Sequence, residues 1–397
     1  MLEGQDILCF APEPWDSLWR NRHQIMSRLA RRNRVLFVEP RPYLRQVLRA
    51  REPRASGPRL RHLQDGLHIY RPPQSAPVSG RQPLKALFDA RRRRSLLEAM
   101  ARVGMCRPIL WLCRPWQADV VGRYNERLLI YHVVDQYAAY EEEFADQVGG
   151  ERLQAIAALD EKMVRQADLT IVTSPALLEA KRGLSPHVHL VRNGVDIAAF
   201  AAALSAPSPP PADIAALPAP IIAIAGVVNE KIDLALLRDL ARARPQWSLA
   251  FIGPVSLRFD KHQLEWLDLP NVHFLGHKPV EMLPHYIAAS HVCLMPYKIN
   301  EWTHHIDPLK MYEYLAAGKP VVSTDIPSAR AFSPPLHIAH DTAGFVSGVE
   351  TALAEASDTQ SEAARRLASL HSWEERVEQI SALVEEALLR TEAAACR

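Results

Sequence analysis

The stretch DPLKMYEYLAAGKPVV, from Asp307 to Val322, is the most informative part of the sequence for the fold. Asp307 is typical of a helix N-cap, Pro308 of a first helical turn and Gly318 of a helix end. An apolar run from 320 to 324 follows at once and predicts a buried strand. A helix followed so closely by a buried strand is typical of an α/β protein with a parallel sheet.

The first turn of this predicted helix is a candidate site for a diphosphate. The main-chain amides of Leu309 and Lys310 have no carbonyl partner within the helix, and the positive end of its dipole lies there. The Lys310 ammonium can add a charge-assisted hydrogen bond. Glu313 lies one turn further on the same face, where its oxygens can accept hydrogen bonds from a vicinal diol such as a ribose. An ordinary capped amphipathic helix is the alternative interpretation.

The same alternation of apolar runs and amphipathic segments extends along the chain. Before residue 200 we expect strands at 6–12, 34–39, 109–113, 128–134 and 169–173, and helices at 20–31 and 151–166. After residue 220 we expect strands at 221–225, 249–253, 272–275, 292–296 and 320–324, and helices at 234–244, 283–289 and 309–317. This order predicts two doubly wound domains, with a ligand crevice outside the carboxyl ends of their strands.

A change in composition separates the two predicted domains. Residues 201–220 are rich in Ala, Pro and Ser, which is typical of a connection. We predict a Rossmann-like domain at 1–197, a linker at 198–219, a second Rossmann-like domain at 220–371, and at 372–397 an amphipathic helix that packs back toward the first domain.

The composition is that of a soluble globular enzyme, with 397 residues of which 48% are hydrophobic and 23% charged. No apolar run is long enough to cross a bilayer, and the first residues do not resemble a signal peptide, so we expect a cytoplasmic protein. The five cysteines show no disulfide or metal spacing and are expected to be free thiols.

The net charge of +2 hides an uneven distribution. Residues 1–120 hold 23 Lys and Arg against 10 Asp and Glu, a net charge of +13. Much of this excess lies between Arg41 and Arg61 and in the run Arg91–Arg94. An anionic membrane surface or a phosphorylated ligand would suit this region, and a solvated arginine-rich surface is the alternative. Nucleic acid is not expected, because aromatic residues do not alternate with the basic ones.

Two further polar groups are candidates for function. His132 and Asp135 stand at the end of a very apolar predicted strand, where α/β enzymes place reactive side chains. A buried His132 and an Asp135 that only caps a helix are the alternatives. Arg20, Arg22 and His23 precede or begin the first predicted helix, where they either bind a phosphate or cap and solvate that helix.

Several enzyme classes lack their sequence signatures in this chain. His304 and His305, and likewise Glu281 and His285, have no accompanying residues to complete a zinc site. The sequence has no Asp-x-Asp pair for a divalent cation, no phosphate-binding Gly-x-x-x-x-Gly-Lys loop, no Gly-x-Gly-x-x-Gly and no Gly-x-Ser-x-Gly. We therefore expect neither a metal nor another cofactor.

Four segments, in order, resemble motifs of the retaining glycosyltransferases of family 4. Residues 313–322 resemble its Glu-Ala-x-Ala-x-Gly-x-Pro-Val-Val signature, and 191–196 its Pro-Asn-Gly-Val-Asp segment. Ala225-Gly226 with Lys231 resembles its diphosphate loop, and 272–276 with 294–297 its base-binding region. The segments 15–17 and 20–24 are similar to a branch of bacterial polysaccharide glycosyltransferases that includes teichuronic-acid enzymes.

The resemblance implies a GT-B fold, in which two Rossmann-like domains face each other across a cleft. It also implies metal-independent transfer of a sugar, with retention, from a UDP- or GDP-linked donor to a growing, lipid-linked cell-surface glycan or exopolysaccharide. The basic N-terminal part would then contact the inner face of the plasma membrane. A sugar-nucleotide epimerase or phosphorylase, or a nucleotide-sugar-binding protein without catalysis, are the alternatives on the same fold.

The resemblance also assigns the site residues. His305 stands where the family has the first glutamate of a Glu-x7-Glu pair, and Val227 where it has an arginine. Asp135 is favoured over His132 as the catalytic residue. The acceptor side comprises Arg20, Arg22, His23 and Trp15. The residues expected to bind the nucleotide sugar are Glu313, Lys310, Leu309, Lys231, Gly226, His305, Gly276 and His277.

Overall fold

The computed structural model describes residues 2–44, 59–80, 82–142, 150–205, 209–257, 261–333 and 335–395. Part of the basic stretch between Arg41 and Arg61, and Cys396, lie outside these residues. The chain forms two compact units. The first comprises Met1–Thr173, Leu177–Val191 and Arg376–Arg397, and the second Ser174–Ala176 and Arg192–Glu375.

The first unit is built on an eight-stranded sheet in the order β3-β4-β2-β1-β5-β6-β7-β8. Strand β3 runs antiparallel to β4, and the other neighbours are parallel. Because the central strands are covered on both faces, they are apolar along their length. The strands are β1 (Asp6–Phe10), β2 (Arg34–Val38), β3 (Leu60–Gln64), β4 (Leu67–Tyr70), β5 (Ile109–Leu112), β6 (Leu128–Val133), β7 (Leu169–Val172) and β8 (Val188–Leu190).

Helices cover both faces of this first sheet. Leu8 and Phe10 of β1 share a buried cluster with Leu96 of α3 and Met163 of α6, which places those two helices on one face. Phe37 points the other way, toward α1, because side chains alternate along a strand. The helices of the unit are α1 (Asn21–Leu29), α3 (Leu84–Arg102), α4 (Tyr137–Glu142), α6 (Gly150–Gln166), α7 (Pro175–Lys181), the short η1 (Pro115–Val120), and most of α17 (Trp373–Ala395).

The second unit contains a six-stranded parallel sheet in the order β11-β10-β9-β12-β13-β14. Strand order changes direction beside β9, which is the position where ligands bind in doubly wound sheets. The strands are β9 (Ile221–Ala225), β10 (Ser248–Ile252), β11 (Val272–Gly276), β12 (Val292–Met295), β13 (Val321–Thr324) and β14 (Leu336–Ala339).

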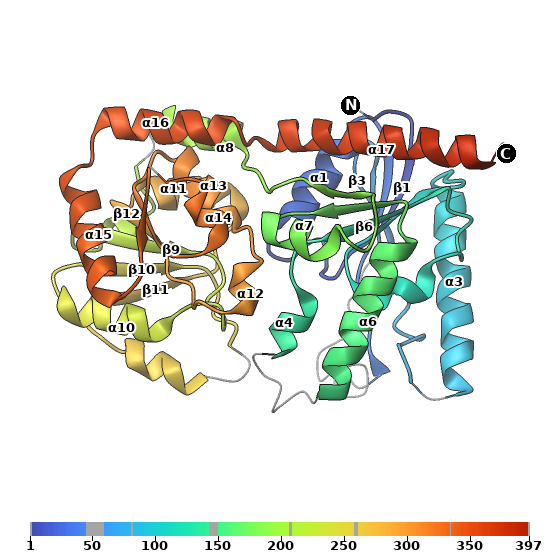
Figure 1. The fold of residues 1–397 in the computed structure, drawn as a ribbon, viewed down its shortest axis with the longest axis horizontal. Coiled ribbons are helices and arrows are strands. Elements are labelled where there is room, and N and C mark those ends of the chain that lie inside the picture. Colours follow the sequence, from blue (N-terminus) through green and yellow to red (C-terminus); the bar gives the residue numbers. More distant parts are fainter. Residues whose placement is uncertain are drawn as a thin grey trace. The chain divides into compact units, whose positions relative to one another are not determined.

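Two groups of helices cover the second sheet (Figure 1). Helices α10 and α15 contact each other, and α15 also packs on β12, β13 and β14. Helix α13 contacts α8 and α16 on the other side, and α11 also contacts α8. The helices are α8 (Ile197–Ser205), α9 (Ala212–Ala215), α10 (Leu234–Ala243), η2 (Lys261–Leu267), η3 (Val280–Met282), α11 (Leu283–Ala288), α12 (Glu301–His304), α13 (Leu309–Ala316), α14 (Pro327–Arg330), α15 (Thr342–Ala354) and α16 (Asp358–Ser369).

The segment predicted as a linker, 198–219, is part of the second unit. It contains most of α8 and all of α9, and Phe200 and Ile214 lie in the buried core of that unit. The prediction of a linker is therefore wrong. Its Pro and Ser residues suggested a connection, but two well-placed apolar side chains are enough to fix the segment to the core.

Among the helices of the described residues, none is both long enough and apolar enough to cross a membrane.

Candidate functional site

Helix α13 is held against the carboxyl ends of two strands by one buried hydroxyl. The Tyr314 hydroxyl accepts a hydrogen bond from the main-chain N–H of Ala225, the last residue of β9, at 2.8 Å. It donates to the main-chain carbonyl of Leu294 in β12 at 3.4 Å. Because Tyr314 is fully buried, this hydroxyl fixes the helix relative to both strands.

Asp307 precedes α13 but does not cap it. The N-cap is Pro308, and the Asp307 carboxylate accepts hydrogen bonds from the Asn193 main-chain N–H at 2.7 Å, the Arg192 guanidinium at 3.2 Å and the Tyr312 hydroxyl at 2.9 Å. Burial raises the pKa of Asp307, and Arg192 and the hydrogen bonds oppose that rise. The prediction of Asp307 as N-cap is wrong, because the segment after β8 occupies its oxygens.

The predicted end of α13 at Gly318 is confirmed. Gly318 has a φ of +71° and donates its N–H to the carbonyl of Leu315 at 2.9 Å. The N–H of Lys319 then reaches the carbonyl of Tyr314 at 3.0 Å, which satisfies the last turn. A Cβ at Gly318 would lie 3.1 Å from the carbonyl oxygen of Ser361, so the left-handed backbone and the close neighbour both favour glycine.

The side chain of Lys310 lies over Gly226, at the carboxyl end of β9. A Cβ on Gly226 would stand 3.5 Å from Cε and 3.6 Å from Nζ of Lys310. The same Nζ is 5.3 Å from the centre of the Tyr297 ring. Burial lowers the pKa of Lys310 to about 8, with the carboxylate of Glu313 acting in the opposite direction. Lys310 is therefore still mostly protonated at pH 7.

Glu313 and Lys231 complete a small charged group around Lys310. Burial raises the pKa of Glu313 to about 7, although the positive charge of Lys310 opposes the shift. The Nζ atom of Lys231 lies 4.4 Å from the centre of the Trp302 ring, and its charge contributes to the lowered pKa of Lys310. Two cations and a half-buried carboxyl thus lie beside the first turn of α13, whose amides are also positive.

Two glycines bring the turns after β9 and β10 into contact beneath Lys310. Gly226 has a φ of +102° and donates its N–H to the carbonyl of Ile252 at 2.8 Å. Gly253 has a φ of +153°, and a Cβ there would lie only 2.0 Å from the carbonyl oxygen of Gly226. Only glycine fits at 253, and Gly253 was not among the residues predicted from the sequence.

The remaining predicted donor-binding residues lie in α13, just after α12, and at the end of β11. Leu309 is the half-buried first residue of α13. His305 is buried, and its Nδ1 lies 2.8 Å from the main-chain oxygen of Glu301. Gly276 ends the edge strand β11, two strands from β9, and His277 after it is exposed. Within the described residues no hydrogen bond or ion pair joins Gly276 or His277 to Lys310.

The raised pKa of Glu313 predicts a pH-dependent stability. Its folded pKa of about 7 exceeds the unfolded value of about 4.3, so the native state holds this proton more tightly. The resulting stabilisation is fully present below about pH 4.3 and is lost as the pH rises through 7. We expect Glu313→Gln to flatten the fall in thermal midpoint between pH 5 and pH 8, measured by scanning calorimetry. Glu362→Gln, at an exposed position on α16, should keep the wild-type slope; parallel curves for all three proteins would contradict the expectation.

In the first unit, Glu13 gathers three arginines just after β1. Its carboxylate pairs closely with the Arg22 guanidinium, and lies 3.6 Å from Nε of Arg20 and 3.9 Å from Nη2 of Arg114. Glu13 was not predicted as a site residue. The signal for it was its position, because it follows β1 just as Asp135 follows β6, and both strands end at the same edge of the sheet.

Asp135 faces the same arginines. It is half-buried after the end of β6 and interacts electrostatically with Arg20, Arg114 and Tyr137. The Arg114 guanidinium carbon lies 4.7 Å from the centre of the Tyr137 ring, whose hydroxyl donates to the carbonyl of Cys113 at 2.8 Å. The cluster therefore holds two carboxylates and three guanidiniums, and Asp135 keeps partial access to solvent.

His132 lies inside the sheet, close to the Asp135 cluster but buried. It is 2% exposed, and its ring centre lies 5.7 Å from that of Trp111. Burial lowers the pKa of His132 to about 3, and the nearby Arg22 charge adds to the effect. His132 is thus neutral and a weak base at pH 7, and Asp135 is the better placed of the two to contact a ligand.

Most of the predicted acceptor residues are packed into the protein. His23 is buried, accepts the Arg20 main-chain N–H at Nδ1 over 3.1 Å, and has a pKa lowered to about 4 by burial, with Arg22 as the next cause. Trp15 is 5% exposed, with its ring 4.9 Å from that of Phe37. The side chain of Arg20 is 44% exposed, so it is the member of this set that can readily reach a ligand.

Among the described residues, no three His, Cys, Asp or Glu side chains are grouped as ligands for a metal ion.

Comparison with known proteins relates the second unit to a known protein family. Residues 219–370, which include β9, Lys310 and Glu313, match the family described as Glycosyl transferases group 1. The second unit thus contains a domain of the group 1 glycosyltransferase family. The match covers the unit in which the two lysines and Glu313 gather at the start of α13.

A relative in Bacillus subtilis (strain 168) extends the similarity beyond this domain. TuaH, named for a glycosyltransferase role in teichuronic acid biosynthesis, is 26% identical over 381 residues. The similar region covers 90% of this chain and 91% of TuaH.

Solved structures identify the fold as GT-B. Sucrose-phosphate synthase from Thermosynechococcus elongatus has a TM-score of 0.70 at 16% identity, covering 97% of this chain and 100% of that one. Anabaena HepE in complex with UDP and glucose has a TM-score of 0.67 at 16% identity, covering 96% and 100%. The predicted fold of two Rossmann-like units is thus confirmed.

Proposed function

We propose that this glycosyltransferase moves a sugar from a UDP- or GDP-linked donor to a hydroxyl of a growing glycan, with retention of anomeric configuration and without a metal ion. The observation that carries the proposal is the charged group of Lys310, Lys231 and Glu313, in which Lys310 lies over Gly226. Two cations beside a helix N-terminus suit a diphosphate, and the carboxyl beside them suits a ribose diol.

In the proposed reaction, the leaving nucleotide diphosphate is stabilised at the start of α13. The amides of Leu309 and Lys310 and the ammonium groups of Lys310 and Lys231 would oppose the negative charge that develops as the bond between the sugar carbon and the phosphate oxygen breaks. These groups take the part that a divalent cation plays in metal-dependent transferases. Their partial burial strengthens each contact, because the local dielectric is lower than in water.

The other parts of the donor would be bound by different residues. Glu313 would hold the ribose hydroxyls, Gly276 and His277 the base, and His305 the sugar. The hydrogen bond from His305 Nδ1 to the Glu301 carbonyl fixes the orientation of the ring. This supports a defined contact between the other ring nitrogen and the sugar.

The acceptor hydroxyl would attack the sugar carbon on the same face from which the leaving group departs. Its proton would pass to the leaving phosphate. Asp135 would orient the sugar and balance charge that develops on it, since its carboxylate is partly open to solvent beside Arg20 and Arg114. His132 would support that end of β6 from inside. Arg20, with Arg22, His23 and Trp15 behind it, would contact the acceptor.

The names of similar proteins support the donor class and the glycan class. Anabaena HepE is described in complexes with UDP and with UDP-glucose, and TuaH is named for teichuronic acid biosynthesis. We infer an acceptor of the same kind: a cell-surface or exopolysaccharide glycan carried on a lipid at the inner face of the plasma membrane.

The function can be tested by release of nucleotide diphosphate. The purified chain would be incubated with a panel of UDP- and GDP-sugars in EDTA, with and without a lipid extract of the producing organism. Release that depends on the extract, with a glycosylated product seen by mass spectrometry, is the expected result. Turnover without any acceptor would instead identify an epimerase, phosphorylase or hydrolase. Tight donor binding with no turnover would identify a binding protein, and loss of activity in EDTA would overturn the metal-free mechanism.

Donor affinity should depend on Glu313. We expect Glu313→Ala to weaken binding of the nucleotide diphosphate by about 1–3 kcal/mol, the range for losing a hydrogen bond to a charged group. Isothermal titration of UDP and GDP would measure it, with the same nucleotides lacking the ribose 2′-hydroxyl as a second ligand. The 2′-deoxy nucleotide should lose much of its sensitivity to the substitution. Unchanged affinity for the ribonucleotide would remove Glu313 from the site.

The basic N-terminal region should bind anionic membranes. Residues 1–120 carry a net charge of +13, and Arg91 and Arg94 on α3 are exposed. We expect vesicles with anionic lipid to retain the protein at low salt and to release it as ionic strength rises, because screening shortens the reach of each charge to about 8 Å near 0.15 M. Arg91→Gln with Arg94→Gln should weaken retention. Equal binding to phosphatidylcholine vesicles would exclude an electrostatic surface.

A further inference from the structure

A pocket lies in the first unit, on the α3 face of its sheet. Phe10, Val38 and Tyr70 line it at the carboxyl ends of β1, β2 and β4, and α3 and the segment around η1 form the opposite wall. The space between these residues is about 420 Å³, part of which is open solvent. It shares no residue with the Glu13 and Asp135 cluster.

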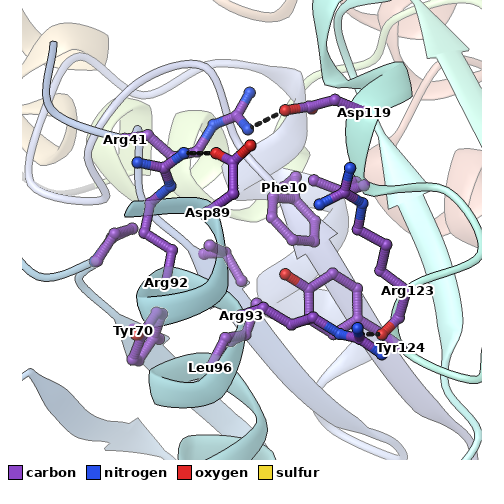
Figure 2. Close-up of a pocket in the computed structure, with 13 residues that line it drawn as sticks. Phe10, Arg41, Tyr70, Asp89, Arg92, Arg93, Leu96, Asp119, Arg123 and Tyr124 are labelled. Carbon is purple, nitrogen blue, oxygen red and sulfur yellow. Dashed lines mark hydrogen bonds and ion pairs between the residues drawn. The ribbon is translucent and has the colours of Figure 1, made fainter. Parts of the chain in front are cut away.

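Basic side chains outnumber acidic ones in this pocket. Arg41, Arg92, Arg93 and Arg123 line it together with Asp89 and Asp119 (Figure 2). Arg92 pairs with Asp89, and Arg41 pairs with Asp119 at 2.6 Å. Among the described residues no carboxylate pairs with Arg93 or Arg123, so the lining carries two more positive than negative charges.

Arg92 and Arg123 differ in their hydrogen-bond partners. The Arg92 guanidinium is buried and also donates to the carbonyls of Ala76 and Pro77, both at 2.7 Å, so its role is structural. For Arg123 the hydrogen bonds within the described residues use main-chain atoms: its N–H donates to the carbonyl of Val120 at 3.3 Å, and its carbonyl accepts from Nε of Arg93 at 3.2 Å. The Arg123 guanidinium, as Figure 2 shows, extends toward the same space as Arg41.

Aromatic side chains form the apolar side of the pocket. The rings of Phe10 and Tyr124 have centres 5.8 Å apart, and Leu96 and Tyr70 lie next to them. Burial raises the pKa of Tyr124 to about 12, despite the nearby charges of Arg41 and Arg123. The Tyr124 hydroxyl therefore stays protonated at neutral pH and can donate to an anion.

We propose that this pocket binds the phosphate of a phosphorylated acceptor, with the Arg41 and Arg123 guanidiniums on the phosphate and the ring of Phe10 or Tyr124 against the organic group. A guanidinium can bind two phosphate oxygens through two parallel N–H groups. Positive charges gathered on a partly apolar wall are unfavourable until an anion neutralises them. The role as acceptor site rests on the proposed glycosyl transfer, whereas the binding of phosphate does not.

The phosphate could come from a soluble sugar phosphate or from a lipid, and titration calorimetry on the full chain would separate the two. Glucose 1-phosphate serves as the soluble probe and farnesyl phosphate as the lipid probe. We expect at least one of them to bind, and the one that binds identifies the source. Affinity should fall at least tenfold in Arg123→Gln and in Arg41→Gln, and should fall with added salt.

The matched control is Arg165→Gln, in the same unit but on α6, where its side chain is 56% exposed and paired with Glu161. It should leave the affinity for both phosphates unchanged. UDP binding, measured in parallel, should be unaffected by all three substitutions, so that failure of the donor site and failure of this pocket can be told apart. Absence of binding by both probes, or an equal loss in Arg165→Gln, would overturn the proposal.

Discussion

Replacement of Lys310 by methionine is expected to lower kcat with the true donor about 10²–10³-fold, the usual effect of removing one group that stabilises charge in a transition state. The methionine keeps the apolar stem that lies over Gly226 and removes only the ammonium group. Lys231 remains nearby, so some activity should persist. Steady-state release of nucleotide diphosphate at saturating donor would measure the change.

Lys319→Met is the control for this experiment. Lys319 is also half-buried and follows α13 at its other end, away from the first turn. It should keep kcat within about twofold of the wild type, since no transition-state charge lies there. If Lys310→Met turned over as fast as Lys319→Met, the diphosphate would have to bind elsewhere.

Asp135→Asn is expected to reduce kcat about 10²–10⁴-fold while KM for the donor stays within about threefold. The amide preserves the shape of the side chain but removes the negative charge that faces Arg20 and Arg114. A loss in kcat without a loss in donor affinity would show that the charge acts on the reacting sugar and not on the nucleotide.

Asp16→Asn is the control for Asp135, because Asp16 lies in the same unit with its side chain 60% exposed and paired with Arg61. It should leave both constants unchanged. Near-wild-type turnover in Asp135→Asn would exclude Asp135 as the catalytic residue, and would direct attention to Glu13 among the same arginines.

Apolar periodicity predicted the parts of the fold that are set locally. The strand at 221–225 has the predicted bounds, and those at 128–134 and 169–173 end one residue early. The hairpin of β3 and β4 was not predicted, because β3 is an edge strand with three of its five residues exposed and no apolar run. Helix α3 was also missed, since its arginine run hides the apolar spacing.

The candidate site was predictable where one segment supplies it and not where distant segments meet. Lys310, Glu313 and Gly318 lie on one helix or at its end, and their spacing places them directly. Asp307 was misassigned because its partners Arg192 and Asn193 come from more than a hundred residues away. His132 is buried whereas Asp135 is partly exposed, and sequence spacing does not reveal this difference in burial.

The contact between Gly226 and Gly253 limits how this enzyme can be redesigned. A library aimed at a new donor sugar would lose every member with a side chain at 253, because that atom would overlap the carbonyl of Gly226 at 2.0 Å. Position 305 is also restricted, because His305 is buried and held by the Glu301 carbonyl, whereas His277 is exposed. Diversity is best introduced at position 277, with both glycines left unchanged.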